Sequence, residues 1–300
     1  MSASNHPPIP SINGGIESPI PVVNDSSEFR IGVLLIEMGK ISVSDAQRIV
    51  KLHEEKGLRF GDAAKQLGLI TEADIQEVLS KQFNYPYVIH ESRFSEELFA
   101  AYKPYSTQVE LLRGIRSQLK LGWFKEKHKS LAISSIDEGT GNSRFAANLA
   151  LVFSQLGEKT LLIDANLRKP KQHDIFNLKN TYGLSDILIG RAGLEAIVDI
   201  APYDMLSVLP AGTIPPNPQE MVSGTLFKEL ILFFRSIYDV VLIDTPAHSM
   251  AADAINISAA AEGAVLIALK HKTRASKMTE VATSLENYGI HIVGSLMIDY

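Results

Sequence analysis

Apolar residues follow two alternating patterns along the last two thirds of the chain. Short apolar runs, typical of buried strands, are separated by longer segments with apolar residues at helical spacing. Strands are predicted at 130–134, 160–164, 206–209, 239–244, 264–269 and 291–297, and helices at 145–156, 184–188, 225–237 and 276–288. This alternation predicts an α/β fold with a doubly wound parallel sheet, in which ligands bind beyond the carboxyl ends of the strands.

The first third of the chain has helical periodicity and an internal repeat. Four positions recur 29 residues later (59 − 30 = 29), with Arg30, Gly32, Leu35 and Gly39 matched by Arg59, Gly61, Ala64 and Gly68. Capping boxes at Ser42–Asp45 and Thr71–Asp74 predict where the longer helices begin. Gly39, Gly57 and Gly68 stand where helices commonly end in a left-handed residue. The pattern predicts a small all-α domain built from two helical units.

These patterns divide the chain into four parts. Residues 1–28 contain five prolines among Ser, Asn and Gly, and their composition predicts a disordered tail. Residues 29–90 are the predicted helical domain with its two 24-residue repeats, residues 91–109 a connector, and residues 110–300 the α/β domain. An amphipathic helix is predicted from Glu110 to about Trp123.

Composition narrows the class of protein. A net charge of −5 gives no general attraction to nucleic acid or to anionic membranes, and no nucleic-acid partner is expected. The chain has no Cys, which fits a reducing compartment. It shows no secretory signal, and no apolar run is long enough for a transmembrane segment. We expect a cytoplasmic protein.

A glycine-containing loop follows the first predicted strand of the α/β domain. Residues 131–150 predict a strand, a loop and a helix, the arrangement in which backbone N–H groups and a helix N-terminus bind phosphates. The P-loop pattern G-x-x-x-x-G-K-[ST] requires a lysine at position 142, but counted back from Ser143 the chain has Asn142, Gly141 and, at the opening position, Ile136. The candidate nucleotide-binding residues are Gly139, Gly141, Asn142, Ser143 and Arg144.

Two carboxylates end other predicted strands. Asp164 follows Leu-Leu-Ile, and Asp244 follows Val-Val-Leu-Ile. At the carboxyl ends of parallel strands, both would lie beside the glycine loop, where carboxylates hold Mg²⁺ and orient a nucleophile in phosphoryl transfer. Asp164 and Asp244 are therefore the candidate catalytic residues, and Ser143, Asp164 and Asp244 the candidate Mg²⁺ ligands.

The α/β domain resembles the bacterial tyrosine kinases of polysaccharide export and their chain-length-determinant relatives. Their motifs S-x-x-P-G-E-G-K-S-T, D-x-D-x-R and D-T-P-P correspond here to residues 135–144, 164–168 and 244–247, and segments 183–190 and 209–218 also match. The resemblance covers roughly residues 105–300 and implies ATP and Mg²⁺ as cofactors. It also implies a membrane polysaccharide co-polymerase as partner, and a homo-oligomer whose interface is the motif Glu110, Arg113 and Arg116.

The chain departs from that family at several site positions. Asn142 replaces the lysine, Arg144 a threonine, Asn166 the second aspartate and Ala247 the last proline. A V-L-N ending, whose Asn faces adenine in the family, is Met297-Ile298 here, and of the tyrosine cluster only Tyr300 is left.

These departures predict a degenerate nucleotide site. An ammonium about 4 Å from a triphosphate contributes up to roughly 4 kcal/mol at an effective dielectric constant of about 20. Its loss could weaken binding or turnover on the order of a thousandfold. Asp137 and Glu138 add negative charge to the loop.

The helical repeat resembles the N-terminal domain of type II secretion and type IV pilus ATPases, in the branch that binds cyclic di-GMP. The motif R-L-G-x-x-L-x-x-x-G, with a later L, L and Q, is matched best by the second copy. The resemblance implies a cyclic di-GMP site at Arg30, Gly32, Leu35, Gly39, Arg59, Gly61, Gly68 and Gln82. In the alternative interpretation the glycines only end helices and the arginines are solvated.

Together these features predict a cytoplasmic regulator of exopolysaccharide biosynthesis or export, recruited to the inner face of the membrane by a partner. In this hypothesis a tyrosine-kinase-like domain with a degenerate site transmits a signal sensed by the helical domain. The alternative from the enzyme class is an active tyrosine autokinase that uses Arg144 in place of the lysine. A partitioning or division ATPase is a third alternative, which the Leu209-Pro-Ala-Gly stretch and the Glu110 motif argue against.

Overall fold

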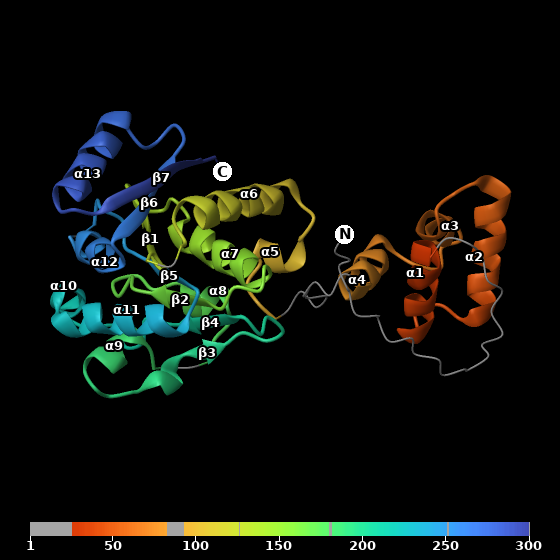
Figure 1. Ribbon diagram of the computed structural model, residues 1–300, viewed down its shortest axis with the longest axis horizontal. Helices are drawn as coiled ribbons and strands as arrows, with labels where there is room; N and C mark the ends of the chain where they lie inside the picture. Colours follow the sequence, from red (N-terminus) through yellow and green to blue (C-terminus); the bar gives the residue numbers. More distant parts are fainter. Residues whose placement is uncertain (1–25, 83–92, 126, 180–181, 251, 300) are drawn as a thin grey trace, which may run out of the picture. The chain divides into compact units, whose positions relative to one another are not determined.

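The computed structural model describes residues 26–82, 93–125, 127–179, 182–250 and 252–299 (Figure 1). The chain forms two compact units, Met1–Gln82 and Phe83–Tyr300. Each has its own buried apolar cluster, and we describe each by itself. Among the described residues, no helix combines the length and apolar character needed to cross a membrane.

The first unit contains the four predicted helices, α1 (Ser26–Glu37), α2 (Val43–Lys56), α3 (Phe60–Gln66) and α4 (Glu72–Gln82). Both predicted capping boxes are confirmed. The Ser42 and Asp45 side chains each accept the other residue's backbone N–H at 3.1 Å, and Thr71 and Asp74 do the same at 3.2 and 2.8 Å. The glycine stops are confirmed too, with φ of 67°, 63° and 67° at Gly39, Gly57 and Gly68.

The other two repeat glycines let helices pack closely. A Cβ on Gly32 would lie 3.1 Å from the Phe60 ring, and one on Gly61 would lie 3.1 Å from Ile75. The core of this unit includes Leu35, Ile49, Ala63, Ala64 and Val78, all fully buried. The repeat is therefore explained by packing: Gly32 of α1 admits the Phe60 side chain of α3, and Gly61 of α3 admits the Ile75 side chain of α4.

The second unit contains a seven-stranded sheet of order β3-β4-β2-β5-β1-β6-β7. The strands are β1 (Ser130–Ser135), β2 (Thr160–Asp164), β3 (Val198–Asp199), β4 (Leu206–Leu209), β5 (Val240–Asp244), β6 (Gly263–Leu269) and β7 (His291–Ile298). All pairs are parallel except β3 with β4. The predicted doubly wound α/β fold is confirmed, and the short antiparallel edge strand β3 is an addition that the apolar pattern did not predict.

Helices cover both faces of this sheet (Figure 1). On one face lie α5 (Phe99–Tyr102), α6 (Thr107–Gly122), α7 (Asn142–Ser154) and α8 (Gln172–Ile175); their side chains share one apolar cluster. The opposite cluster contains residues from α9 (Leu184–Leu188), α10 (Pro218–Ser223), α11 (Thr225–Ile237), α12 (Asp253–Ala261) and α13 (Ala275–Asn287). A 3₁₀ turn, Leu194–Ala196, precedes β3. Helices α9 and α11 have the predicted bounds, whereas α5, α8, α10 and α12 were not predicted.

Part of the predicted connector belongs to the core of the second unit. Phe94, Leu98, Ala100 and Ala101 are buried in the cluster beneath α7. The buried Asn148 side chain accepts the Ala100 N–H at 2.8 Å, which fixes α5 to α7. The sequence contains no signal of this packing, because the apolar residues of this short segment follow neither a helical nor a strand period.

Candidate functional site

The loop between β1 and α7 lies at the carboxyl ends of the central strands, where β1 pairs with β5 on one side and β6 on the other. This is the topological switch point, the usual ligand site in such sheets. Gly139 and Gly141 have φ of 75° and 74°, which glycine adopts without strain. The loop forms one wall of a cavity of about 410 Å³, and the segment after β2 contributes Asn166, Lys169 and Lys171 to its lining.

Asn142, at the lysine position of the loop, directs its amide group into the protein. Its Nδ2 donates to the Ile133 carbonyl at 2.8 Å, to Asp244 Oδ1 at 2.7 Å and to the Thr245 carbonyl at 3.1 Å. Among the described residues, its buried Oδ1 has no hydrogen-bond partner. The side chain therefore binds the strand-end carboxylate and provides no charge for a phosphate.

Gln172, at the start of α8, holds the other oxygen of the same carboxylate. Its Nε2 donates to Asp244 Oδ2 at 2.8 Å and to the Ser143 carbonyl at 3.0 Å, and the side chain is fully buried. The sequence contains no signal for Gln172, because a single glutamine eight residues after the end of a predicted strand belongs to no recognised motif. Both oxygens of Asp244 are thus bound by neutral amides.

Asp164 and Asp244 end adjacent strands in direct register, and both are fully buried. Asp164 accepts the backbone N–H groups of Asn166, Lys171 and Gln172 at 3.2, 2.9 and 2.9 Å. Burial, followed by the neighbouring Asp244, raises the pKa of the Asp164 carboxyl. Burial also raises the pKa of Asp244, although hydrogen bonds to this carboxylate oppose the shift.

The two acidic residues of the loop are neutralised by lysines. Asp137 pairs with Lys277 at 2.7 Å and accepts the Thr273 hydroxyl at 2.9 Å. The bond from Lys277 is the largest cause of the lowered pKa of Asp137. The Glu138 carboxylate pairs with Lys169. The negative charge that the sequence placed in this loop is therefore compensated in the structure.

The rest of the second motif has a structural role. Arg168 forms a two-point ion pair with Asp253, at 2.7 and 3.2 Å, and so fixes the loop after β2 to the start of α12. The Asn166 Oδ1 accepts the backbone N–H of Lys169 at 3.1 Å, which closes the turn that lines the cavity.

The other positions at which the chain departs from the family motifs lie in different parts of the second unit. Ala247 and Arg144 line the cavity, whereas Met297 and Ile298 lie on β7 outside its lining, and Met297 is 72% exposed. Tyr300 lies outside the described residues.

On α6 the Glu110 carboxylate pairs with Arg113, and the Arg116 Nη1 donates to the Val152 carbonyl at 2.7 Å. Glu110 is exposed, so the acidic end of this motif is accessible on the surface of the second unit.

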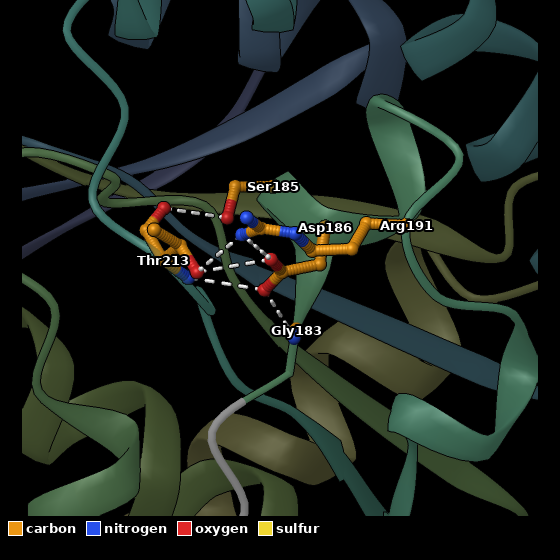
Figure 2. A network of polar contacts seen from close by, with 5 residues as sticks. All are labelled: Gly183, Ser185, Asp186, Arg191 and Thr213. Atoms are coloured by element: carbon orange, nitrogen blue, oxygen red, sulfur yellow. Dashed lines mark hydrogen bonds and ion pairs between the residues drawn. The ribbon is translucent and has the colours of Figure 1, made fainter.

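A second polar network joins the two further segments of the resemblance (Figure 2). Asp186 Oδ2 accepts the N–H groups of Gly183 and Thr213 at 3.1 and 3.0 Å, and Oδ1 accepts the Thr213 hydroxyl at 2.9 Å and Arg191 Nη1 at 3.2 Å. Burial raises the pKa of the Asp186 carboxyl, but these bonds outweigh it and hold the pKa below its ordinary value. The network fixes α9 against the loop after β4.

In the first unit, the residues of the predicted cyclic di-GMP site have different structural roles: some pack in the core, some end helices and some are exposed on the surface. Leu35 is fully buried, Gly32 and Gly61 pack against side chains, and Gly39 and Gly68 end helices. Arg30 and Arg59 are exposed. Gln82 ends α4, and its side chain lies outside the described residues.

The residues present fit a nucleotide polyphosphate in part. The left-handed glycines and the N-terminus of the 13-residue α7 suit phosphate oxygens. Of the predicted Mg²⁺ ligands, Ser143 lines the cavity and its hydroxyl suits this ion, whereas Asp164 and Asp244 are fully buried and lie outside the cavity lining. The lysine contribution does not fit, because the side chain at position 142 donates to protein acceptors. The second unit is thus a P-loop-type α/β domain with asparagine at the lysine position of its phosphate loop.

Known proteins identify the family. The chain is 37% identical over 206 residues to tyrosine-protein kinase YwqD of Bacillus subtilis, covering 69% of this chain and 87% of that protein. It is 34% identical over 200 residues to putative tyrosine-protein kinase CapB of Staphylococcus aureus, covering 67% and 88%. No model of a known protein family matches the chain. The chain belongs to the family of bacterial tyrosine-protein kinases.

Solved structures agree with this assignment. The kinase domain of Escherichia coli tyrosine kinase ETK matches with a TM-score of 0.66 at 27% identity, over 70% of this chain and 82% of that one. The chimerical protein CapA2B2 matches with a TM-score of 0.64 at 30% identity, over 74% and 97%.

Proposed function

We propose that this protein is a cytoplasmic regulator of exopolysaccharide biosynthesis or export, in which the tyrosine-kinase fold is a signalling scaffold with a weakened phosphoryl-transfer site. The hydrogen bonding of the Asp244 carboxylate is the observation that supports this proposal. Asn142 and Gln172 donate to its two oxygens, and the lysine that would bind the terminal phosphates is absent. A bound nucleotide would therefore meet the loop backbone and Ser143, without a lysine at loop position 142 beside the transferred phosphoryl group.

In this proposal the scaffold acts by binding a membrane partner and other copies of the chain. We infer a membrane polysaccharide co-polymerase as the partner that recruits the chain to the inner face of the membrane, since the α/β domain resembles, in its motifs, the tyrosine kinases of polysaccharide export. The motif of Glu110, Arg113 and Arg116 on α6 is the proposed contact between copies of the chain.

The test is phosphoryl transfer by the purified protein with Mg-ATP. We expect hydrolysis and phosphotyrosine no higher than in an Asp244→Asn variant, because the loop has no lysine at position 142 and both oxygens of Asp244 already accept from amides. Restoring the charge with Asn142→Lys is the matched gain-of-function variant. Hydrolysis by the wild type that Asp244→Asn abolishes would contradict the scaffold proposal.

The second candidate is an active tyrosine autokinase. It is favoured by the family itself, whose named members are tyrosine-protein kinases, and by Arg144, a cation that lines the cavity beside Ser143. Phosphotyrosine formed with Mg-ATP and lost in both Ser143→Ala and Arg144→Ala would establish this alternative.

For the helical unit we propose a sensing role, with cyclic di-GMP as the candidate ligand. Packing and helix ends account for the glycines, so the exposed Arg30 and Arg59 support the ligand proposal. Guanidinium groups bind guanine edges and phosphates through paired hydrogen bonds. Calorimetric titration should show binding that Arg59→Ala removes and that Arg48→Ala, another exposed arginine of this unit, retains. Equal affinity of the two variants would exclude this ligand site.

A further inference from the structure

The phosphate loop of this chain needs a positive charge from elsewhere if it is to hold a nucleotide polyphosphate. Its backbone N–H groups and the α7 N-terminus provide only partial charges. Asn142 gives none, because its Nδ2 is bound to three oxygens of the protein. The basic residues among the described lining of the cavity are Arg144, Lys169 and Lys171.

Most of the nearby lysines already hold the loop in place. Lys277 pairs with Asp137, and Lys272 Nζ donates to the Glu138 carbonyl at 3.1 Å. Neither belongs to the cavity lining. Lys169 lines the cavity but pairs with the Glu138 carboxylate. The charges of Lys169 and Lys277 are therefore balanced by the two acidic residues of the loop.

Lys171 differs from these lysines in its partner, which lies outside the loop. It lines the cavity, and its backbone N–H donates to the buried Asp164 at 2.9 Å, so its Cα is fixed at the strand end. Its side chain is 59% exposed and pairs with Asp174, itself 58% exposed, at 3.5 Å. Exposed pairs of this kind contribute little, so a phosphate can replace the carboxylate at small cost.

We propose that Lys171 is the phosphate-binding cation of this site and, from the segment after β2, replaces the missing lysine of the loop. The ligand class is a nucleoside diphosphate or triphosphate, bound through its terminal phosphates. This inference shares its cavity with the proposed function and rests on it only for the class of ligand. Arg144 and Lys169 also line the cavity and are the competing cations, and alanine variants of each separate them from Lys171.

The experiment is calorimetric titration of the full chain with Mg-ADP and with a non-hydrolysable Mg-ATP analogue. Lys171→Ala should weaken binding by about tenfold or more, because a unit charge next to a polyphosphate is lost in a partly enclosed site. Lys171→Arg should retain affinity within about threefold. Lys125→Ala is the matched control: Lys125 precedes β1 at the amino ends of the strands, away from the cavity, and should change affinity by less than about twofold.

A double-mutant cycle tests the replacement itself. In an Asn142→Lys background, the loop has its own ammonium, and Lys171→Ala should then cost less than about threefold. Where Asn142→Lys does not fold, Lys171→Glu in the wild-type background is the second variant, with a larger loss than Lys171→Ala expected. Thermal unfolding of each variant without nucleotide checks that the fold is retained.

Three results would overturn the inference: equal affinities of Lys171→Ala and Lys125→Ala, a large loss in Arg144→Ala or Lys169→Ala with none in Lys171→Ala, or no nucleotide binding by the wild type. The last leaves the scaffold function standing. Conversely, phosphotyrosine formation that depends on Asp244 would contradict the scaffold function while leaving the role of Lys171 intact, so the two proposals fail separately.

Discussion

Asn142 shows how one side chain changes the use of a whole loop. An ammonium at this position would reach a phosphate, whereas the shorter amide reaches the Asp244 carboxylate at 2.7 Å and two backbone carbonyls. The backbone geometry of the loop is retained, with Gly139 and Gly141 in the left-handed region. At this position, therefore, the fold of a phosphate loop and its charge are separable properties.

Gly183 is the residue whose substitution we expect to be most damaging in the second unit. A Cβ there would lie 2.1 Å from the Pro210 carbonyl oxygen and 2.3 Å from the Gly212 nitrogen, both backbone atoms. Gly183→Ala should force the two segments of the Asp186 network apart and lower the free energy of unfolding by about 3 kcal/mol or more, measured by urea denaturation.

Gly114→Ala is the matched control, because a Cβ on this exposed residue of α6 has no atom within 4 Å. Replacing glycine by alanine inside a helix stabilises it by up to about 1 kcal/mol. Similar destabilisation by both substitutions would show that the close approach at Gly183 is not the cause.

At the scale of elements, the helices of the first unit depend on local caps. Thr71→Ala removes the hydroxyl that accepts the Asp74 N–H at 3.2 Å and should cost about 1 kcal/mol of stability, whereas Thr71→Ser should cost much less. Lys40, followed by Thr71, lowers the pKa of Asp74 from 3.8 to about 2. Because the folded-state pKa is the lower one, this stabilisation is present above pH 3.8 and is lost as the pH falls to about 2.

The measurement is urea denaturation followed by helical circular dichroism between pH 2 and pH 7. The difference between the wild type and Asp74→Asn should be largest near neutral pH and should vanish near pH 2. A difference that stays constant over this range would mean that the ionised form of Asp74 does not stabilise α4.

At the scale of the whole molecule, the two units have separate apolar cores, so we expect separate unfolding transitions. Leu35→Ala, in the core of the first unit, should cost about 2 to 5 kcal/mol there. The single tryptophan, Trp123, is buried in the second unit, so its fluorescence reports on that unit alone. Circular dichroism should show the helical transition at lower temperature while the fluorescence transition is unchanged.

Leu131→Ala in β1 provides the reciprocal control, because it should shift the fluorescence transition. An equal shift of both transitions in Leu35→Ala would show that the two units unfold as one cooperative body.

Features that depend on a few neighbouring residues could be predicted from the sequence. The buried strands, the bounds of α9 and α11, the capping boxes and the left-handed helix ends follow from apolar periodicity and from backbone rules that act within about four residues. Short elements such as β3, α5 and α8 have too few residues to show a period, so they were missed.

The α/β class, the phosphate-loop glycines and the absence of lysine at position 142 can all be read from contiguous residues. The partners of the charged and amide side chains, by contrast, depend on how distant segments pack together. Lys277 reaches Asp137 across 140 positions of the chain, and Gln172 reaches Asp244 across 72. These pairs form because β6 lies next to β1, and β5 next to β2, in the sheet, and strand order is set by the packing of the whole domain rather than by any local pattern.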